Sequence, residues 1–209
     1  ANHYFEKNGA VIIGSDGCWE ALQIDGDAKF AEMAGREPGL KSRYPDLKMG
    51  QLQLTFAKSM TIHLPGVDVQ VLHSAHNGKS HSLGDSIAYI ERDRILFAGD
   101  LLYTRYHPVT VYGDIPNWIC SIDNLMTQSF TSVLPGHGPV SEGGEAYRAA
   151  FAEFRAYLND FHQRLVEMTA GKYTAGDVET HMKSGSYAHM GKTWMVKRNI
   201  EYFLKQGHA

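Results

Sequence analysis

Three apolar runs in this chain each lead into a short glycine-containing segment that carries a histidine or an aspartate. The segments are Lys79-Ser80-His81-Ser82-Leu83-Gly84-Asp85, Phe97-Ala98-Gly99-Asp100 and Leu134-Pro135-Gly136-His137-Gly138. Short apolar runs that end at glycine are typical of buried strands. Side chains at the ends of such strands can converge on one metal site although they are distant in the sequence. The pattern predicts a layered α/β fold with a metal site along one edge of a sheet.

Strands are expected at 10–14, 52–56, 60–64, 67–73, 86–90, 94–98 and 131–134. Residues 16–36 form a helical pattern that we expect to be broken at Asp25-Gly26-Asp27. Helices are further expected at 115–126, 145–168, 174–183 and 192–205, because apolar residues recur there at helical spacing. Trp118 is expected to pack into the core.

The composition is that of an ordinary globular chain, with 209 residues, 43% hydrophobic residues and 21% charged residues. This size favours a single domain over residues 1–209. A formal net charge of −3 gives no basic footprint for a nucleic acid. No apolar stretch approaches the roughly 18 to 20 residues of a membrane span, and the N-terminus lacks a signal-peptide pattern. We therefore expect a soluble chain without a nucleic-acid or membrane partner, with the cytoplasm favoured over the periplasm.

The residues alone leave alternatives open for each proposed ligand. A histidine such as His81 is usually a surface or structural residue. Asp100 follows an apolar run too hydrophobic to bury an unpaired carboxylate, so it needs either a cation or hydrogen-bond donors, as at the N-cap of a helix. His137 lies in a turn constrained by glycine and proline, which could serve packing instead.

Taken together, the three segments resemble the second half of the metallo-beta-lactamase superfamily. In that family the corresponding segments supply metal ligands, and the matching residues here are His81, Asp100 and His137. The residues from Asn2 to Ile13 resemble the stretch that comes directly after the family's main ligand motif, His-x-His-x-Asp-His, and that motif is absent from this sequence. The resemblance implies a four-layer αββα sandwich whose N-terminal strands are missing.

The resemblance also implies a function. It predicts a zinc-dependent hydrolase that acts on a small ester, thioester, lactone or lactam through a metal-bound hydroxide. His81 would serve one zinc ion and His137 another, with Asp100 bridging them, and the other ligands would come from the absent motif. We therefore expect one or two zinc ions in a complete site, and partial or no occupancy in this chain.

Residues after Asp100 are candidates for binding the small-molecule substrate, namely Tyr103, Arg105 and His107, although a polar loop with aromatic anchors explains them nearly as well. His73 and His76 could join His81 at a metal, but solvent or turn positions are favoured for both. His63 is expected to be structural, Lys79 to be solvated, and Cys18 and Cys120 to be buried free thiols.

The alternative function is a non-catalytic member of the fold that self-associates or binds a partner. A homo-oligomer would then cover the sheet surface that the missing strands leave open.

Overall fold

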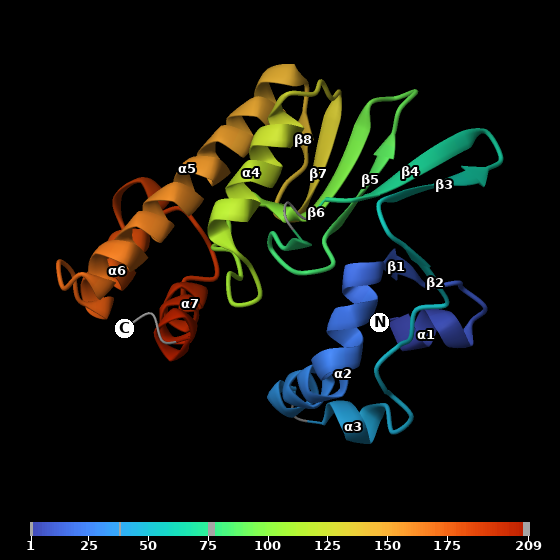
Figure 1. Cartoon of the computed structure of the whole chain (residues 1–209), viewed down its shortest axis with the longest axis horizontal. Helices are drawn as coiled ribbons and strands as arrows, with labels where there is room; N and C mark the ends of the chain where they lie inside the picture. The colour runs from blue at the N-terminus through green and yellow to red at the C-terminus, as the bar shows by residue number, and fades with distance from the viewer. Residues whose placement is uncertain (1, 38, 75–77, 207–209) are drawn as a thin grey trace.

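A six-stranded mixed sheet forms the centre of the computed structural model, which describes residues 2–37, 39–74 and 78–206 (Figure 1). Its strand order is β3-β4-β5-β6-β7-β8, and only the β6–β7 pair is parallel. The strands are β3 (Ser59–Leu64), β4 (Val67–His73), β5 (Ser86–Ile90), β6 (Ile95–Tyr103), β7 (Ser132–His137) and β8 (Ser141–Glu142). The predicted strands at 67–73 and 86–90 are confirmed at both ends.

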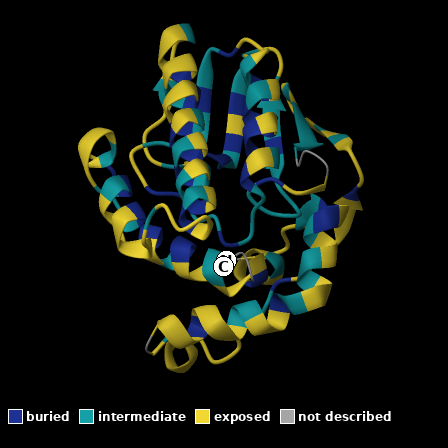
Figure 2. Cartoon of the chain, turned by 60° about the vertical axis from the view of Figure 1, so that its left-hand side comes forward, coloured by how far each residue is buried: buried dark blue, intermediate teal, exposed yellow. Residues whose placement is uncertain are grey.

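Two long helices cover one face of this sheet. They are α4 (Ile115–Met126), whose predicted bounds are confirmed, and α5 (Gly144–Thr169). Apolar side chains of both helices and of the sheet face beneath them form the main core, and Trp118 is fully buried within it, as expected. Figure 2 shows this arrangement as buried positions facing the sheet and exposed positions facing outward. Asp114 caps α4 by accepting a hydrogen bond from the backbone N–H of Asn117 at 2.9 Å.

The first 56 residues form a smaller unit of short elements around one long helix. It consists of α1 (Asn2–Lys7), β1 (Ile13–Ser15), α2 (Asp16–Arg36), α3 (Leu40–Arg43) and β2 (Leu54–Phe56), and β1 and β2 pair in parallel as a separate two-stranded sheet.

The predicted break in α2 at Asp25-Gly26-Asp27 is wrong, because the helix runs without interruption from Asp16 to Arg36. Gly26 is buried in the helix, where a side chain would meet Leu22 at 3.4 Å. Asp25 pairs with Lys29 one turn later at 2.9 Å, which supports the helix at the point where composition suggested a turn.

The N-terminus of α2 is attached to the segment that carries His81. Ser15 caps the helix by accepting from the N–H of Cys18 and donates its own hydroxyl hydrogen to the carbonyl of Gly84 at 3.0 Å. A β-carbon on Gly17 would lie 2.2 Å from the carbonyl oxygen of Leu83, and one on Gly84 would lie 2.5 Å from the α-carbon of Cys18. Only glycine permits this approach, so α2 fixes the position of the loop before β5.

The other face of the six-stranded sheet is apolar, and its described side chains are only partly buried or exposed. Cross-strand register places Val71, Ala88, Phe97 and Leu134 in one row across β4, β5, β6 and β7. A second group of apolar residues continues this face, comprising Met60, Ile62, Leu64, Val67, Val69, Ile90 and Ile95. Leu64 is 50% exposed and Phe97 is 41% exposed, and α4 and α5 lie on the opposite side.

The chain ends in α6 (Ala175–Met182), a 3₁₀ turn η2 (Gly185–Tyr187) and α7 (Trp194–Lys205). Between η2 and α7, Gly191 forms an isolated parallel bridge with Tyr106, which joins the C-terminal segment to the loop after β6. Among the described residues, no helix is both long enough and apolar enough to cross a membrane.

Candidate metal centre

Asp100 lies between the other two predicted ligands. Its Oδ2 is 3.7 Å from Nε2 of His81, and its Oδ1 is 3.7 Å from Nε2 of His137. The structure therefore brings together residues from three separate segments. Asp100 lies inside β6 instead of at its end, because β6 continues past the predicted boundary at residue 98 with irregular register against β7.

His81 is held in one orientation by a carboxylate and an aromatic ring. Its Nδ1 is 3.2 Å from Oδ1 of Asp85, which leaves Nε2 on the side of Asp100. Asp85 is itself fixed by the backbone N–H and the hydroxyl of Ser82, at 2.6 and 2.7 Å. The imidazole meets Trp118 edge-on, with ring centroids 5.1 Å apart. A carboxylate behind a histidine fixes the tautomer that presents the other nitrogen to a metal ion.

Sequence reasoning gave Asp85 no role, although it belongs to the segment that was singled out. The signal was its position four residues after His81 and three after Ser82, which allows a carboxylate to fold back onto both.

A buried tyrosine binds the carboxylate of Asp100 from within β6. The Tyr103 hydroxyl donates to Oδ2 of Asp100 at 3.0 Å. Burial, together with the charge of Asp100, raises the pKa of Tyr103 well above its ordinary value, so this residue stays a neutral donor. The ring of Tyr103 also lies against His137, with centroids 4.8 Å apart.

The glycines on either side of His137 allow its turn to lie directly on β6 and the loop after that strand. A β-carbon at Gly136 would lie 2.0 Å from Oδ1 of Asp100, and one at Gly138 would lie 1.9 Å from the carbonyl of Thr104. The backbone N–H of Thr104 donates to the carbonyl of His137 at 2.9 Å. The two glycines of the Pro-Gly-His-Gly sequence therefore allow the backbone of this turn to lie close to Asp100 and Thr104.

The donor types fit zinc, although the set is incomplete. Imidazole nitrogen and carboxylate oxygen are both zinc ligands, and two donors about 2.1 Å from one ion at a tetrahedral angle are about 3.4 Å apart. Each His–Asp separation of 3.7 Å is close to this value. Because the two histidines face different oxygens of Asp100, they form two pairs. In the described ranges, no three His, Cys, Asp or Glu side chains converge as a complete metal site.

The predicted substrate-binding residues have three different environments. Tyr103 is buried under the centre, Arg105 is exposed beside it, and His107 is fully buried. The cavity bordered by Tyr103 and Arg105 measures only about 10 Å³. Burial leaves His107 unavailable to a substrate in this structure, so its expected place in an open pocket does not agree with the fold.

His107 instead takes part in packing between the loop after β6 and α5. Its Nδ1 shares a hydrogen bond with the hydroxyl of Tyr157 at 3.0 Å, and its buried Nε2 has no partner among the described residues. Burial, and secondarily the charges of Lys183 and His189, lowers the pKa of His107 to about 4.

His73 and His63 have partners other than the three predicted ligands. Nε2 of His73 is 3.1 Å from the carbonyl of Leu83, and His63 is an exposed partner of Asp68. His76 falls outside the described residues. Cys18 and Cys120 are both free, as expected, but Cys18 is only partly buried and Cys120 is exposed, which corrects the expectation that both are buried.

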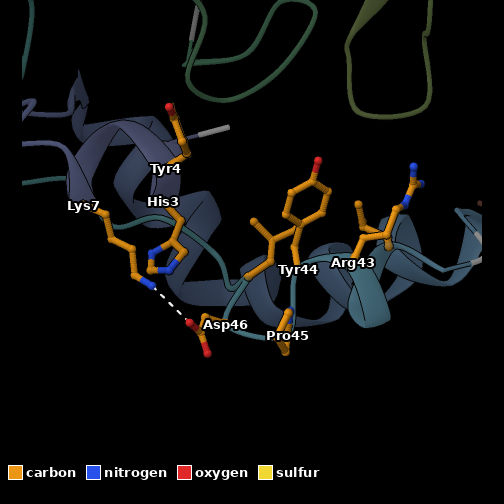
Figure 3. Close-up of a pocket in the computed structure, with 9 residues that line it drawn as sticks. His3, Tyr4, Lys7, Arg43, Tyr44, Pro45 and Asp46 are labelled. Carbon is orange, nitrogen blue, oxygen red and sulfur yellow. Dashed lines mark hydrogen bonds and ion pairs between the residues drawn. The ribbon is translucent and has the colours of Figure 1, made fainter.

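A separate pocket of about 560 Å³ lies between α1 and the segment from Leu40 to Leu47 (Figure 3). Figure 3 shows the imidazole of His3 beside the Lys7–Asp46 pair, whose charged atoms are 3.5 Å apart. Both ring nitrogens of His3 are buried without a hydrogen bond in the described structure, and Nδ1 is 3.7 Å from Glu6. None of the predicted metal ligands lines this cavity.

No family model matches the chain. Among solved structures, it is similar to the stereoselective inverting sec-alkylsulfatase Pisa1 from Pseudomonas sp., with a TM-score of 0.65 and 12% identity over 99% of this chain and 38% of that one. It is similar to a metallo-beta-lactamase family protein from Thermus thermophilus, with a TM-score of 0.59 and 17% identity over 99% of this chain and 70% of that one.

A metallo-beta-lactamase from Pontibacter korlensis is also similar, with a TM-score of 0.52 and 19% identity over 75% of this chain and 61% of that one. The chain thus spans less than two thirds of the Pontibacter and Pseudomonas proteins. At these identities the likeness concerns the fold alone. The chain has an α/β fold of the metallo-beta-lactamase type.

Proposed function

We propose that this protein is a zinc-dependent hydrolase of the metallo-beta-lactamase superfamily that acts on a small ester, thioester, lactone or lactam. The observation that carries the proposal is the placement of His81 and His137 at opposite oxygens of Asp100, each 3.7 Å away. The fold supports the same conclusion, although a fold alone does not select a reaction.

In this proposal His81 and Asp100 hold one ion, and His137 and Asp100 hold the other. Zinc, when bound, would lower the pKa of a water molecule on it to about 7, and it would polarise the oxygen of the group under attack. Asp85 keeps Nε2 of His81 free for its ion. Tyr103 donates to Asp100 and holds its carboxylate in place. Each pair gives only two donors, so we expect this chain to bind zinc weakly or at partial occupancy.

The test measures hydrolysis of an ester, thioester, lactone and lactam panel by the protein, before and after zinc removal by EDTA. We expect zinc-dependent hydrolysis that is lost in Asp100→Asn and retained in Asp68→Asn, whose carboxylate is exposed and pairs with His63. A natural protein that neither binds zinc nor hydrolyses any of the panel contradicts the proposal. Tight binding of two zinc ions by the 209-residue chain alone contradicts the expected partial occupancy.

A second candidate function is suggested by the apolar face of the six-stranded sheet, where Leu64 and Phe97 are exposed. Apolar areas of this kind mark surfaces that associate, so the chain would be a non-catalytic protein that pairs through this face. Size-exclusion chromatography with light scattering tests it. A monodisperse monomer at micromolar concentration contradicts this candidate, whereas a defined dimer without zinc-dependent activity favours it.

A further inference from the structure

A cavity of about 490 Å³ lies between the N-terminus of α4, the second half of α5 and α7 (Figure 1). This volume is within the range of small-molecule binding sites, about 300 to 1,000 Å³. The predicted metal ligands His81, Asp100 and His137 do not line it. The cavity is therefore separate from the candidate metal centre.

Buried hydrogen bonds hold the walls of this cavity in place. Asn199 of α7 is only 1% exposed, and its side-chain oxygen accepts from the N–H of Thr110 at 3.1 Å. Its side-chain amide donates to the carbonyl of Pro108 at 2.8 Å. The N–H of Asp114 donates to the carbonyl of Ser80 at 2.7 Å. The loop before α4 is thus attached on two sides, so the cavity is formed before a ligand binds.

Asp114 gives the cavity a negative charge. The described residues that line the cavity include no lysine or arginine. Oδ1 of Asp114 accepts from the N–H of Asn117 at 2.9 Å, and the carboxylate forms no ion pair within the described part of the chain. The N-terminus of α4 contributes a partial charge of only about +0.5, which does not cancel a full carboxylate charge. A cation is therefore the complementary ligand group.

His162 of α5 lines the same cavity with an uncharged imidazole. Burial lowers the pKa of His162, and the charge of Asp114 raises it to a smaller extent. The ring is therefore neutral at pH 7, and it forms no hydrogen bond to another described residue. A neutral imidazole has one nitrogen that accepts a hydrogen bond. His162 thus adds an acceptor without adding a positive charge.

Apolar and aromatic side chains make up much of the remaining lining. Ile115 and Leu165 are buried, whereas Val166 is 49% exposed and Tyr202 is 37% exposed. Apolar surface of this kind favours the binding of an apolar chain. An aromatic ring such as that of Tyr202 also attracts a cation that lies over its face.

We propose that this cavity binds a small protonated primary amine, with its ammonium group at Asp114 and its apolar chain against Val166 and Tyr202. An ammonium group donates three hydrogen bonds. The carboxylate of Asp114 and the unprotonated nitrogen of His162 are the acceptors that the lining offers. The inference does not depend on the proposed hydrolase function, because the cavity contains none of the predicted metal ligands.

The experiment measures binding of hexylammonium, hexanol and hexanoate to the chain by calorimetry, so that only the charge at one end of the probe differs. Low ionic strength is used because salt screens a partly exposed carboxylate. Asp114→Asn removes the charge but keeps α4 capped, since asparagine is as good an N-cap as aspartate. Asp177→Asn is the matched control, because it makes the same charge change in the first turn of α6. Val166→Trp is a second variant that fills the cavity from an exposed position.

We expect Asp114→Asn to weaken binding of hexylammonium about tenfold, the usual effect of losing a charge-assisted hydrogen bond. Asp177→Asn should stay within about threefold of the unaltered protein, an interval well below that effect. Val166→Trp should weaken binding of hexylammonium and hexanol alike. Equal affinity of the unaltered protein and Asp114→Asn for hexylammonium overturns the proposal. Binding of hexanoate as tight as that of hexylammonium also overturns it, as does the absence of measurable binding of hexylammonium.

Nuclear magnetic resonance locates the bound amine. Hexylammonium should shift the imidazole signals of His162 and the side-chain amide signals of Asn199, and these shifts should be much smaller in Asp114→Asn at the same probe concentration. Bound hexylammonium that leaves both sets of signals unchanged contradicts the proposed site. Amine binding by a protein that hydrolyses no substrate leaves this inference standing while the proposed function fails. Zinc-dependent hydrolysis without amine binding gives the reverse result.

Discussion

Asp85 orients His81, whose Nε2 faces Asp100. Its carboxylate lies 3.2 Å from Nδ1 of His81 and is only 8% exposed. We expect Asp85→Asn to lower zinc affinity about 10- to 100-fold, the usual effect of removing a carboxylate behind a histidine ligand. Competition with a chromophoric chelator measures the affinity. Asp68→Asn, at the exposed pair with His63, is the control and should leave it unchanged. Equal affinities for the two variants would show that Asp85 does not orient a ligand.

Gly136 controls the position of Asp100 from the facing turn. A methyl group there would lie 2.0 Å from Oδ1 of Asp100, so we expect Gly136→Ala to cost about 1 to 3 kcal/mol of unfolding free energy through overpacking. Urea denaturation measures this change. Gly35→Ala is the control, since a β-carbon at that helical position meets nothing within 4 Å. It should be neutral or stabilising by up to about 1 kcal/mol. A Gly136→Ala protein as stable as the control would contradict the close packing.

His107 makes the stability of the protein depend on pH. Its pKa of about 4 in the folded chain lies below the ordinary value of about 6.5. Between these values the unfolded chain binds a proton that the folded chain does not, so the free energy of unfolding falls as pH decreases from about 6.5 to about 4. The expected loss is on the order of 3 kcal/mol.

Urea denaturation at several pH values tests this dependence. His107→Gln should flatten it in that window while lowering stability at pH 7. His63→Gln, which changes an exposed histidine, should leave the dependence intact. If His107→Gln leaves the pH dependence unaltered, groups other than His107 cause the fall in the free energy of unfolding.

At the scale of elements, α2 and the loop before β5 form one packed unit through Ser15. This serine is fully buried and both caps α2 and donates to Gly84. We expect Ser15→Ala to destabilise the protein by about 1 to 2 kcal/mol, because it removes the cap of α2 and one of the two hydroxyl groups that donate to the carbonyl of Gly84, the other being that of Ser86. Thermal unfolding measures the loss. Ser42→Ala, at an exposed serine whose hydroxyl donates to the carbonyl of Gly39, should have a small effect. Similar melting temperatures for the two variants would contradict the role of Ser15 in joining α2 to the loop before β5.

Strands and helices of the sheet region could be predicted from periodicity, because their apolar faces meet one core. The strand at 67–73 and the helix at 115–126 are predicted to the residue. Periodicity could not show that α2 continues through Asp25-Gly26-Asp27. Packing around Gly26 and the ion pair of Asp25 with Lys29 favour the helix there, against a turn-like composition. Periodicity also could not show that β6 extends through Asp100. This extension comes from irregular pairing with β7, in which Gly99 lies opposite Pro135 and Tyr103 opposite His137.

His81, Asp100 and His137 could be proposed from the sequence because each lies in a short glycine-containing segment next to an apolar run. The contact between Nζ of Lys192 and Nδ1 of His137, at 3.4 Å, could not be found in this way, since the two residues are 55 positions apart in the chain. The burial of His107 was equally hidden, because the helix that covers it begins almost forty residues later.

At the scale of the whole molecule, one face of the six-stranded sheet has a helical cover and the other has exposed apolar side chains. Phe97 lies in the middle of that face, at 41% exposure. We expect Phe97→Lys to reduce self-association of the chain in sedimentation velocity by placing a charge in the apolar row. Val166→Lys is the control, because Val166 is 49% exposed on α5. Unchanged sedimentation of Phe97→Lys would show that this face does not mediate association.

The parallel pairing of β6 and β7 has a consequence for how the chain reaches this structure. These two strands can meet only after the segment that contains α4 has crossed over the sheet, whereas β3, β4 and β5 pair with their sequence neighbours. Contacts between distant positions form slowly, because closing a long loop costs entropy before any contact offsets it. We therefore expect His81, Asp100 and His137 to come together late in folding, after the hairpins of the sheet have formed.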